Sequence, residues 1–110
     1  MPDSRPTIST HVLDTGSGGP AAGVPVRLLR LGDDGGETVA GEGLTDGDGR
    51  IRDLLGDQTL ERGAYRLQFG LSDGTFFTGL SVDLRIDDAT RSYHVPLLRA
   101  PFGLSTYRGS

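Results

Sequence analysis

Cysteine and lysine are both absent from this chain of 110 residues, so all eleven of its basic residues are arginines. Without cysteine the chain can form no disulfide, and it offers no thiolate as a nucleophile or as a zinc ligand. Without lysine it cannot form a Schiff base with a carbonyl substrate. Proton transfer near neutral pH is therefore left mainly to histidine.

The chain also lacks an excess of positive charge and any long apolar run. Its formal net charge is −4, which provides no basic surface for nucleic acid or an anionic membrane. No run approaches the roughly 18 apolar residues of a membrane span, and residues 1–6 contain no apolar segment of a secretory signal. We therefore expect a cytoplasmic protein with no nucleic-acid partner and no membrane partner.

Glycine and proline are abundant, and short alternating segments lie between them. The 18 glycines and 6 prolines have no collagen-like period and are typical of turns between strands. Ile8 and Val12 share one face of a segment whose other face carries His11, as in a half-buried strand. The expected strands are 7–14, 24–31, 37–45, 50–55, 64–71, 80–86, 92–98 and 103–107.

This pattern predicts an all-β fold. No window of a dozen residues shows the period of an amphipathic helix, so an α/β fold has little support. About eight short antiparallel strands favour a two-sheet β-sandwich. We expect a flexible N-terminus at residues 1–6 and one sandwich domain at residues 7–110. A chain of this size buries about 65% of its unfolded surface, so a buried site is expected to need a second subunit.

Three common site motifs are incomplete here. Asp46-x-Asp48 opens like a calcium loop, but Ile51 stands where that loop needs glycine. Segment 16–19 lacks the third glycine of a dinucleotide-binding loop and precedes no helix pattern. No Gly-x-Ser-x-Gly sequence occurs, so a serine hydrolase triad has no support.

His11 and His94 are the only histidines, the side-chain type with an ordinary pKa near neutrality. Each is out of phase with the apolar row of its strand, so both are expected to face away from the core. Two histidines without a third ligand at recognisable spacing make a weak zinc site, and proton transfer suits them better. A solvated or structural role for either histidine stays open.

Aromatic and β-branched residues continue almost to the end of the chain, in segment 102–110. Chain ends are usually small and polar. On composition alone, a structural last strand is the simpler interpretation of this segment.

Four segments carry a family resemblance: Ser9–Asp14 (STHVLD), Gly49-Arg50, Tyr93–Leu98 (YHVPLL) and the terminal Tyr107–Ser110 (YRGS). In order, and over nearly the whole chain, they resemble the transthyretin-like 5-hydroxyisourate hydrolases of purine catabolism. The terminal tetrapeptide separates these hydrolases from the hormone-carrying transthyretins that share their fold. The resemblance implies a transthyretin-like β-sandwich that adds water to 5-hydroxyisourate and opens its ring. The product would be 2-oxo-4-hydroxy-4-carboxy-5-ureidoimidazoline, on the route from urate to allantoin.

The resemblance also implies the site and the assembly. The residues with an implied catalytic role are His11, Arg50, His94 and Ser110, and those with an implied role in substrate binding are Tyr107, Arg108 and Gly109. No metal and no organic cofactor is implied. The expected assembly is a homotetramer, a dimer of dimers, with the sites in a channel between the dimers.

The chain departs from the family pattern in two places. Only about residues 72–79 separate the fifth and sixth expected strands, where related hydrolases carry a short helix, so we expect this helix to be shortened or absent. Arg99 stands where the family often has an apolar residue, and Leu104 where it often has an aromatic one. The sequence therefore does not predict how the residues beside the C-terminal segment pack. Neither departure removes a catalytic candidate.

Other functions remain open at this level. A non-catalytic module of the same fold would hold an aromatic ligand in an intersubunit channel, as transthyretin does. A purely structural sandwich would be a monomer without a channel, and a metal-dependent hydrolase would lose activity to a chelator. The roles of the two histidines also remain interchangeable.

Overall fold

A computed structural model describes residues 5–109, and within this range the chain forms nine strands and no helix. The strands are β1 (Ile8–Asp14), β2 (Gly19–Pro20), β3 (Pro25–Leu31), β4 (Glu37–Leu44), β5 (Arg50–Ile51), β6 (Gly63–Gly70), β7 (Gly79–Ile86), β8 (Tyr93–Ala100) and β9 (Gly103–Thr106). The predicted all-β fold is confirmed, including the missing helix between β6 and β7. No described segment is a helix long and apolar enough to cross a membrane. Residues 1–4, most of the predicted flexible N-terminus, and Ser110 lie outside the described residues.

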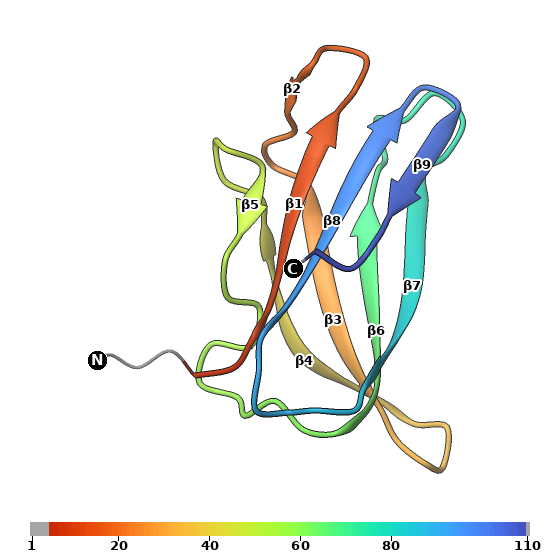
Figure 1. The fold of residues 1–110 in the computed structure, drawn as a ribbon. Coiled ribbons are helices and arrows are strands. Elements are labelled where there is room, and N and C mark those ends of the chain that lie inside the picture. The colour runs from red at the N-terminus through yellow and green to blue at the C-terminus, as the bar shows by residue number, and fades with distance from the viewer. Residues whose placement is uncertain (1–4, 110) are drawn as a thin grey trace.

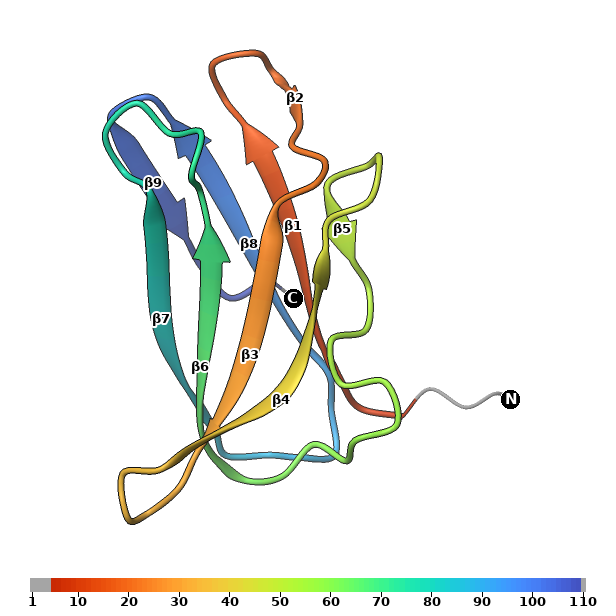
Figure 2. The same ribbon diagram turned by 180° about the vertical axis from the view of Figure 1, so that it is seen from behind.

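The strands form two sheets that lie face to face (Figure 1). Sheet A has the order β2-β1-β8-β9, and β5 also pairs with β1. Sheet B has the order β4-β3-β6-β7. Figure 2 shows the molecule from behind, with sheet B toward the viewer. The two-sheet sandwich expected from the alternation is therefore confirmed.

One pairing differs from the expected antiparallel arrangement. β1 and β8 are parallel over their length, with Ser9 opposite His94 and Val12 opposite Leu97. Hairpins force consecutive strands to be antiparallel, but β1 and β8 are separated by all of sheet B and are under no such constraint. The other strand pairings are antiparallel.

Two strand boundaries also differ from the sequence expectation. The loop expected after β1 contains the short strand β2, which pairs Pro20 with Leu13. The strand expected at 50–55 ends at Ile51, and Leu54, expected on the same face as Arg50, is instead buried in the core. Its N–H donates to the backbone oxygen of Ile8 (3.0 Å). Burying this apolar side chain is more favourable than continuing the short strand, so the strand ends before Leu54.

The core lies between the sheets and is built from alternate residues of the central strands. The core residues of β1, β3, β6 and β8 that point from one sheet toward the other include Ile8, Val12, Val26, Leu28, Tyr65, Leu67, Phe69, Tyr93, Val95 and Leu97. Thr10 is buried in the same row, and its hydroxyl donates to the backbone oxygen of Val95 (2.6 Å). The residues between them in β1 and β8 consequently face away from sheet B.

Arg99 has a clear partner in the short β6–β7 connection. Its guanidinium donates to Asp73 Oδ1 (3.0 Å), and only 12% of its side chain is exposed. Leu104 packs against the core from β9. Both unusual residues beside the C-terminal segment therefore make specific contacts, and Arg99 holds the loop that stands where related hydrolases are expected to have a helix.

Candidate functional site

His11 and Arg50 lie opposite each other on neighbouring strands. They are Cα partners in the antiparallel β1–β5 pair, so their side chains point to the same side of sheet A. Both are half-buried. We call this outer surface of sheet A, which carries Ser9, His11, Arg50 and His94, the site face.

A tight turn places Arg50 beside β1. The Asp46 carboxylate accepts hydrogen bonds from the backbone N–H groups of Asp48 and Arg50 (both 2.9 Å). The N–H of Arg50 is the main reason why the pKa of Asp46 lies below its usual range. Gly49 has a φ of 77°, and a Cβ there would lie 2.4 Å from the backbone oxygen of Val12. The Gly-Arg sequence after the Asp-Gly turn therefore has a local structural cause.

His94 joins the same face from β8. It is the Cα partner of Ser9 in the parallel ladder, and its Nδ1 lies 2.9 Å from Ser9 Oγ. His11 is two residues further along β1 than Ser9, so the two histidines are diagonal neighbours on the site face. The prediction that both histidines face away from the core is confirmed by their half-buried positions between buried neighbours.

The C-terminal segment returns across β8 after β9 ends (Figure 1). The N–H of Gly109 donates to the backbone oxygen of His94 (2.7 Å), which forms an antiparallel bridge. A Cβ at Gly109 would lie 2.8 Å from His94 Cδ2, closer than carbon atoms approach without displacement. Glycine at this position therefore allows the segment to pack against the imidazole ring.

Arg50 and the two histidines meet on the site face, where no carboxylate of residues 5–109 pairs with Arg50. Burial lowers the pKa of His94 below its usual 6.5, and the charges of Arg50 and His11 lower this pKa further. Among the ion pairs of residues 5–109, none involves Arg50, whereas nearby Arg52 pairs with Asp46 (3.0 Å). The neutral imidazole of His94 can accept a proton, and the guanidinium of Arg50 is available to an anionic oxygen.

Tyr107 and Arg108, two other predicted residues of the C-terminal segment, make no side-chain hydrogen bond with either histidine in the described chain. Tyr107 and Arg108 are exposed and border a hollow of about 340 Å³ between β7 and β8, beside Leu84 and Val95. Ser110, predicted to be catalytic, lies outside the described residues. In the described chain, His11, Arg50, His94 and Gly109 are thus the predicted residues that the fold brings together.

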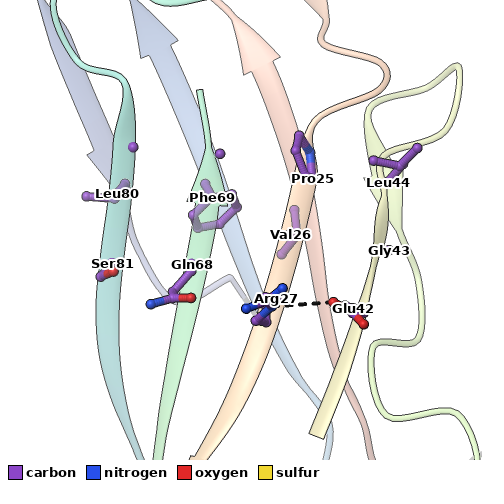
Figure 3. Close-up of a pocket in the computed structure, with 12 residues that line it drawn as sticks. Pro25, Val26, Arg27, Glu42, Gly43, Leu44, Gln68, Phe69, Leu80 and Ser81 are labelled. Carbon is purple, nitrogen blue, oxygen red and sulfur yellow. Dashed lines mark hydrogen bonds and ion pairs between the residues drawn. The ribbon is translucent and has the colours of Figure 1, made fainter. Parts of the chain in front are cut away.

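A second hollow lies on the outer surface of sheet B (Figure 3). It has a volume of about 560 Å³ and is open, with Gly43, Gly70 and Gly79 among its lining residues. Its charged groups, Arg27 and Glu42, pair with each other (3.3 Å). No group there is both titratable near neutrality and unpaired, so the site face is the stronger candidate. Within residues 5–109 no cluster of three or more histidine, aspartate or glutamate side chains is arranged to hold a metal ion.

Sequence reasoning did not identify Ser9 as a site residue. The only local signal is its position two residues before His11, which places both on one face of β1. Its contact with His94 depends on the parallel register of β1 and β8, for which the sequence contains no local signal.

Comparisons with known proteins agree with this arrangement. The model of the HIUase/Transthyretin family matches residues 8–109. A relative named 5-hydroxyisourate hydrolase, from Caulobacter vibrioides, is 43% identical, over 94% of this chain and 97% of its own. The structure of Klebsiella pneumoniae 5-hydroxyisourate hydrolase superposes with a TM-score of 0.82 at 35% identity, covering 96% of this chain and 99% of the other. Sea bream transthyretin in complex with thyroxine superposes with a TM-score of 0.85 at 27% identity, covering 93% of each chain.

Proposed function

The chain belongs to the HIUase/Transthyretin family, and from this membership and the site face we propose that it is a 5-hydroxyisourate hydrolase. It hydrolyses 5-hydroxyisourate by adding water and opening the ring, a step in urate degradation. The product is 2-oxo-4-hydroxy-4-carboxy-5-ureidoimidazoline. The observation that carries this function is the meeting of His11, Arg50 and His94 on one face of sheet A.

Opening a cyclic amide requires a nucleophilic water, stabilisation of the negative oxygen at the attacked carbonyl, and a proton for the departing nitrogen. We assign the first task to neutral His94, which takes a proton as the water oxygen bonds to the carbonyl carbon. Arg50 stabilises the negative oxygen that forms. His11 delivers the proton to the ring nitrogen as the carbon–nitrogen bond breaks. The two histidine roles could be exchanged without changing the balance of protons.

The C-terminal segment supplies the remaining contacts in this proposal. Gly109 packs against the ring of His94, and in this proposal Ser110 binds the polar edge of the substrate. Tyr107 and Arg108 border a separate hollow in the single chain, so we propose that they reach the substrate across the contact with a second subunit. The guanidinium of Arg108 offers several donors in one plane, which suits carboxylate or carbonyl oxygens. Removing residues 109–110 should strongly reduce turnover with little change in thermal stability, because a chain end contributes little core burial. A truncated protein with full turnover would argue that this segment is only structural.

We propose a homotetramer, a dimer of dimers, in which a second subunit covers the site face. Two observations support an oligomer. The site face is only half-buried in the single chain, and β7 and β9 end their sheets with no further strand beside them within residues 5–109. Sedimentation velocity would test the assembly, and a monomer would contradict it. A cytoplasmic location remains a prediction.

The direct test uses 5-hydroxyisourate made freshly from urate by urate oxidase. Adding the protein should accelerate the ultraviolet decay above the spontaneous rate, and His94→Ala should abolish the acceleration. The similarity to a transthyretin in complex with thyroxine supports one competing function, a binding module without catalysis. A folded protein that gives no acceleration, but binds an aromatic ligand, would favour that function.

A further inference from the structure

The ring of His94 is held at two opposite edges by parts of the chain that are far apart in sequence. Nδ1, on one edge, lies 2.9 Å from Ser9 Oγ on β1. Cδ2, on the other edge, faces Gly109, where a Cβ would lie only 2.8 Å away. Neither Ser9 nor Gly109 therefore engages the end of the ring formed by Cε1 and Nε2.

A neutral imidazole exists as two tautomers, and only one of them leaves a lone pair on Nε2. Burial, and after it the electrostatic interactions with Arg50 and His11, lower the pKa of His94 and so favour the neutral ring. The neutral ring alone does not decide which nitrogen carries the proton. In proteins this is decided by the hydrogen bond at the other nitrogen.

We propose that Ser9 is a positioning residue, whose Oγ accepts a hydrogen bond from Nδ1 of His94 and so leaves the lone pair on Nε2. This inference rests on the proposed function, because it matters only if His94 takes the proton from water. Ser9 does not contact substrate in this account and acts through His94. This positioning role accounts for the serine that lies directly opposite His94 in the β1–β8 ladder.

The role of Ser9 predicts a specific kinetic change. The net free energy of one ordinary hydrogen bond corresponds to a factor of about two to ten in population. Ser9→Ala should therefore lower kcat about two- to tenfold, and KM should change much less than kcat. Ser9→Thr retains the hydroxyl and should restore most of kcat. Ser81→Ala removes the same group from the exposed outer surface of sheet B and is the matched control.

Nitrogen-15 NMR of labelled imidazole measures the tautomer without measuring activity. In the wild-type protein above the pKa of His94, we expect the proton on Nδ1, and in Ser9→Ala a shift toward the tautomer protonated on Nε2. A wild-type ring protonated on Nε2 would overturn the inference even if Ser9→Ala failed to fold. Unchanged kcat and tautomer in folded Ser9→Ala would also overturn it. Failure of wild-type protein to accelerate hydrolysis would instead contradict the proposed function.

Discussion

The outer surfaces of the two sheets differ in whether their charged side chains form ion pairs. On sheet B, Arg66 donates to both carboxylate oxygens of Asp83 (2.7 and 3.2 Å) and to Glu37 (2.6 Å). On the site face of sheet A, Arg50 and two histidines meet without a carboxylate partner among the described ion pairs. Paired charges on an exposed surface contribute little beyond solubility. A guanidinium that no carboxylate of the described chain engages, beside a neutral imidazole, can act on a substrate.

The two sheets also differ in how far apart in the sequence their paired strands lie. Sheet B is a series of antiparallel neighbours, β4-β3-β6-β7. In sheet A the first strand, β1, pairs with both β5 and β8, so the site face combines residues from three separate segments of the chain. A catalytic site needs several side chains close together. Sheet A can supply them from distant parts of the sequence because β1 pairs with these strands over long sequence separations.

The largest expected effect comes from removing a charged or titratable group of the site face. His94→Ala and Arg50→Ala should each lower kcat/KM for 5-hydroxyisourate about a hundredfold or more, because one loses the base and the other the stabilising donor. Arg66→Ala, the matched change on sheet B, should leave kcat/KM near the wild-type value. If Arg66→Ala and Arg50→Ala lost activity equally, the distinction between the two surfaces would be wrong.

The second largest effect on activity is expected from adding a methyl group at Gly109. Gly109→Ala places a Cβ against the ring of His94 and must displace either the ring or the segment. Because small displacements of a catalytic group are costly, we expect kcat to fall about ten- to hundredfold. Gly103→Ala is the matched control, since a Cβ there meets no atom within 4 Å. Steady-state kinetics with thermal unfolding would separate displacement from loss of fold.

The electrostatics of the site face predict a change in the titration of His94. The charge of Arg50 lowers the pKa of His94, so Arg50→Gln should raise this pKa toward 6.5. Turnover that needs the neutral ring falls as pH drops through this pKa, and in Arg50→Gln the fall should begin at higher pH. NMR titration of His94 measures the shift directly. Arg52→Gln, whose charge is paired with Asp46, should move the pKa less.

The smallest effect is expected on sheet B. Asp83→Asn removes the carboxylate that receives two hydrogen bonds from Arg66. Exposed ion pairs are weak and screened by salt, so the melting temperature should fall only slightly at low salt and converge with the wild type at high salt. Kinetics should be unaffected. A large, salt-independent loss of stability would show that this surface is more than solvated charge.

The alternation along β1 and β8 was sufficient to predict which residues reach the site face. It placed His11 and His94 away from the core, and both are. The alternation expected along residues 50–55 was wrong for Leu54, because burial of its side chain in the core outweighs extension of the two-residue strand β5. Local pattern fails where a side chain has a more favourable position in the tertiary structure.

The sequence by itself determined the all-β class, the faces of the strands and the turn before Arg50, because these depend on side-chain periodicity and on residues adjacent in the chain. Only the tertiary structure decided that β1 lies parallel to β8 with Ser9 opposite His94. A shift of two residues would keep every side chain on its face and yet replace Ser9 by His11 as the partner of His94. Pairing between distant strands is set by packing of the whole core, so no local pattern contains it.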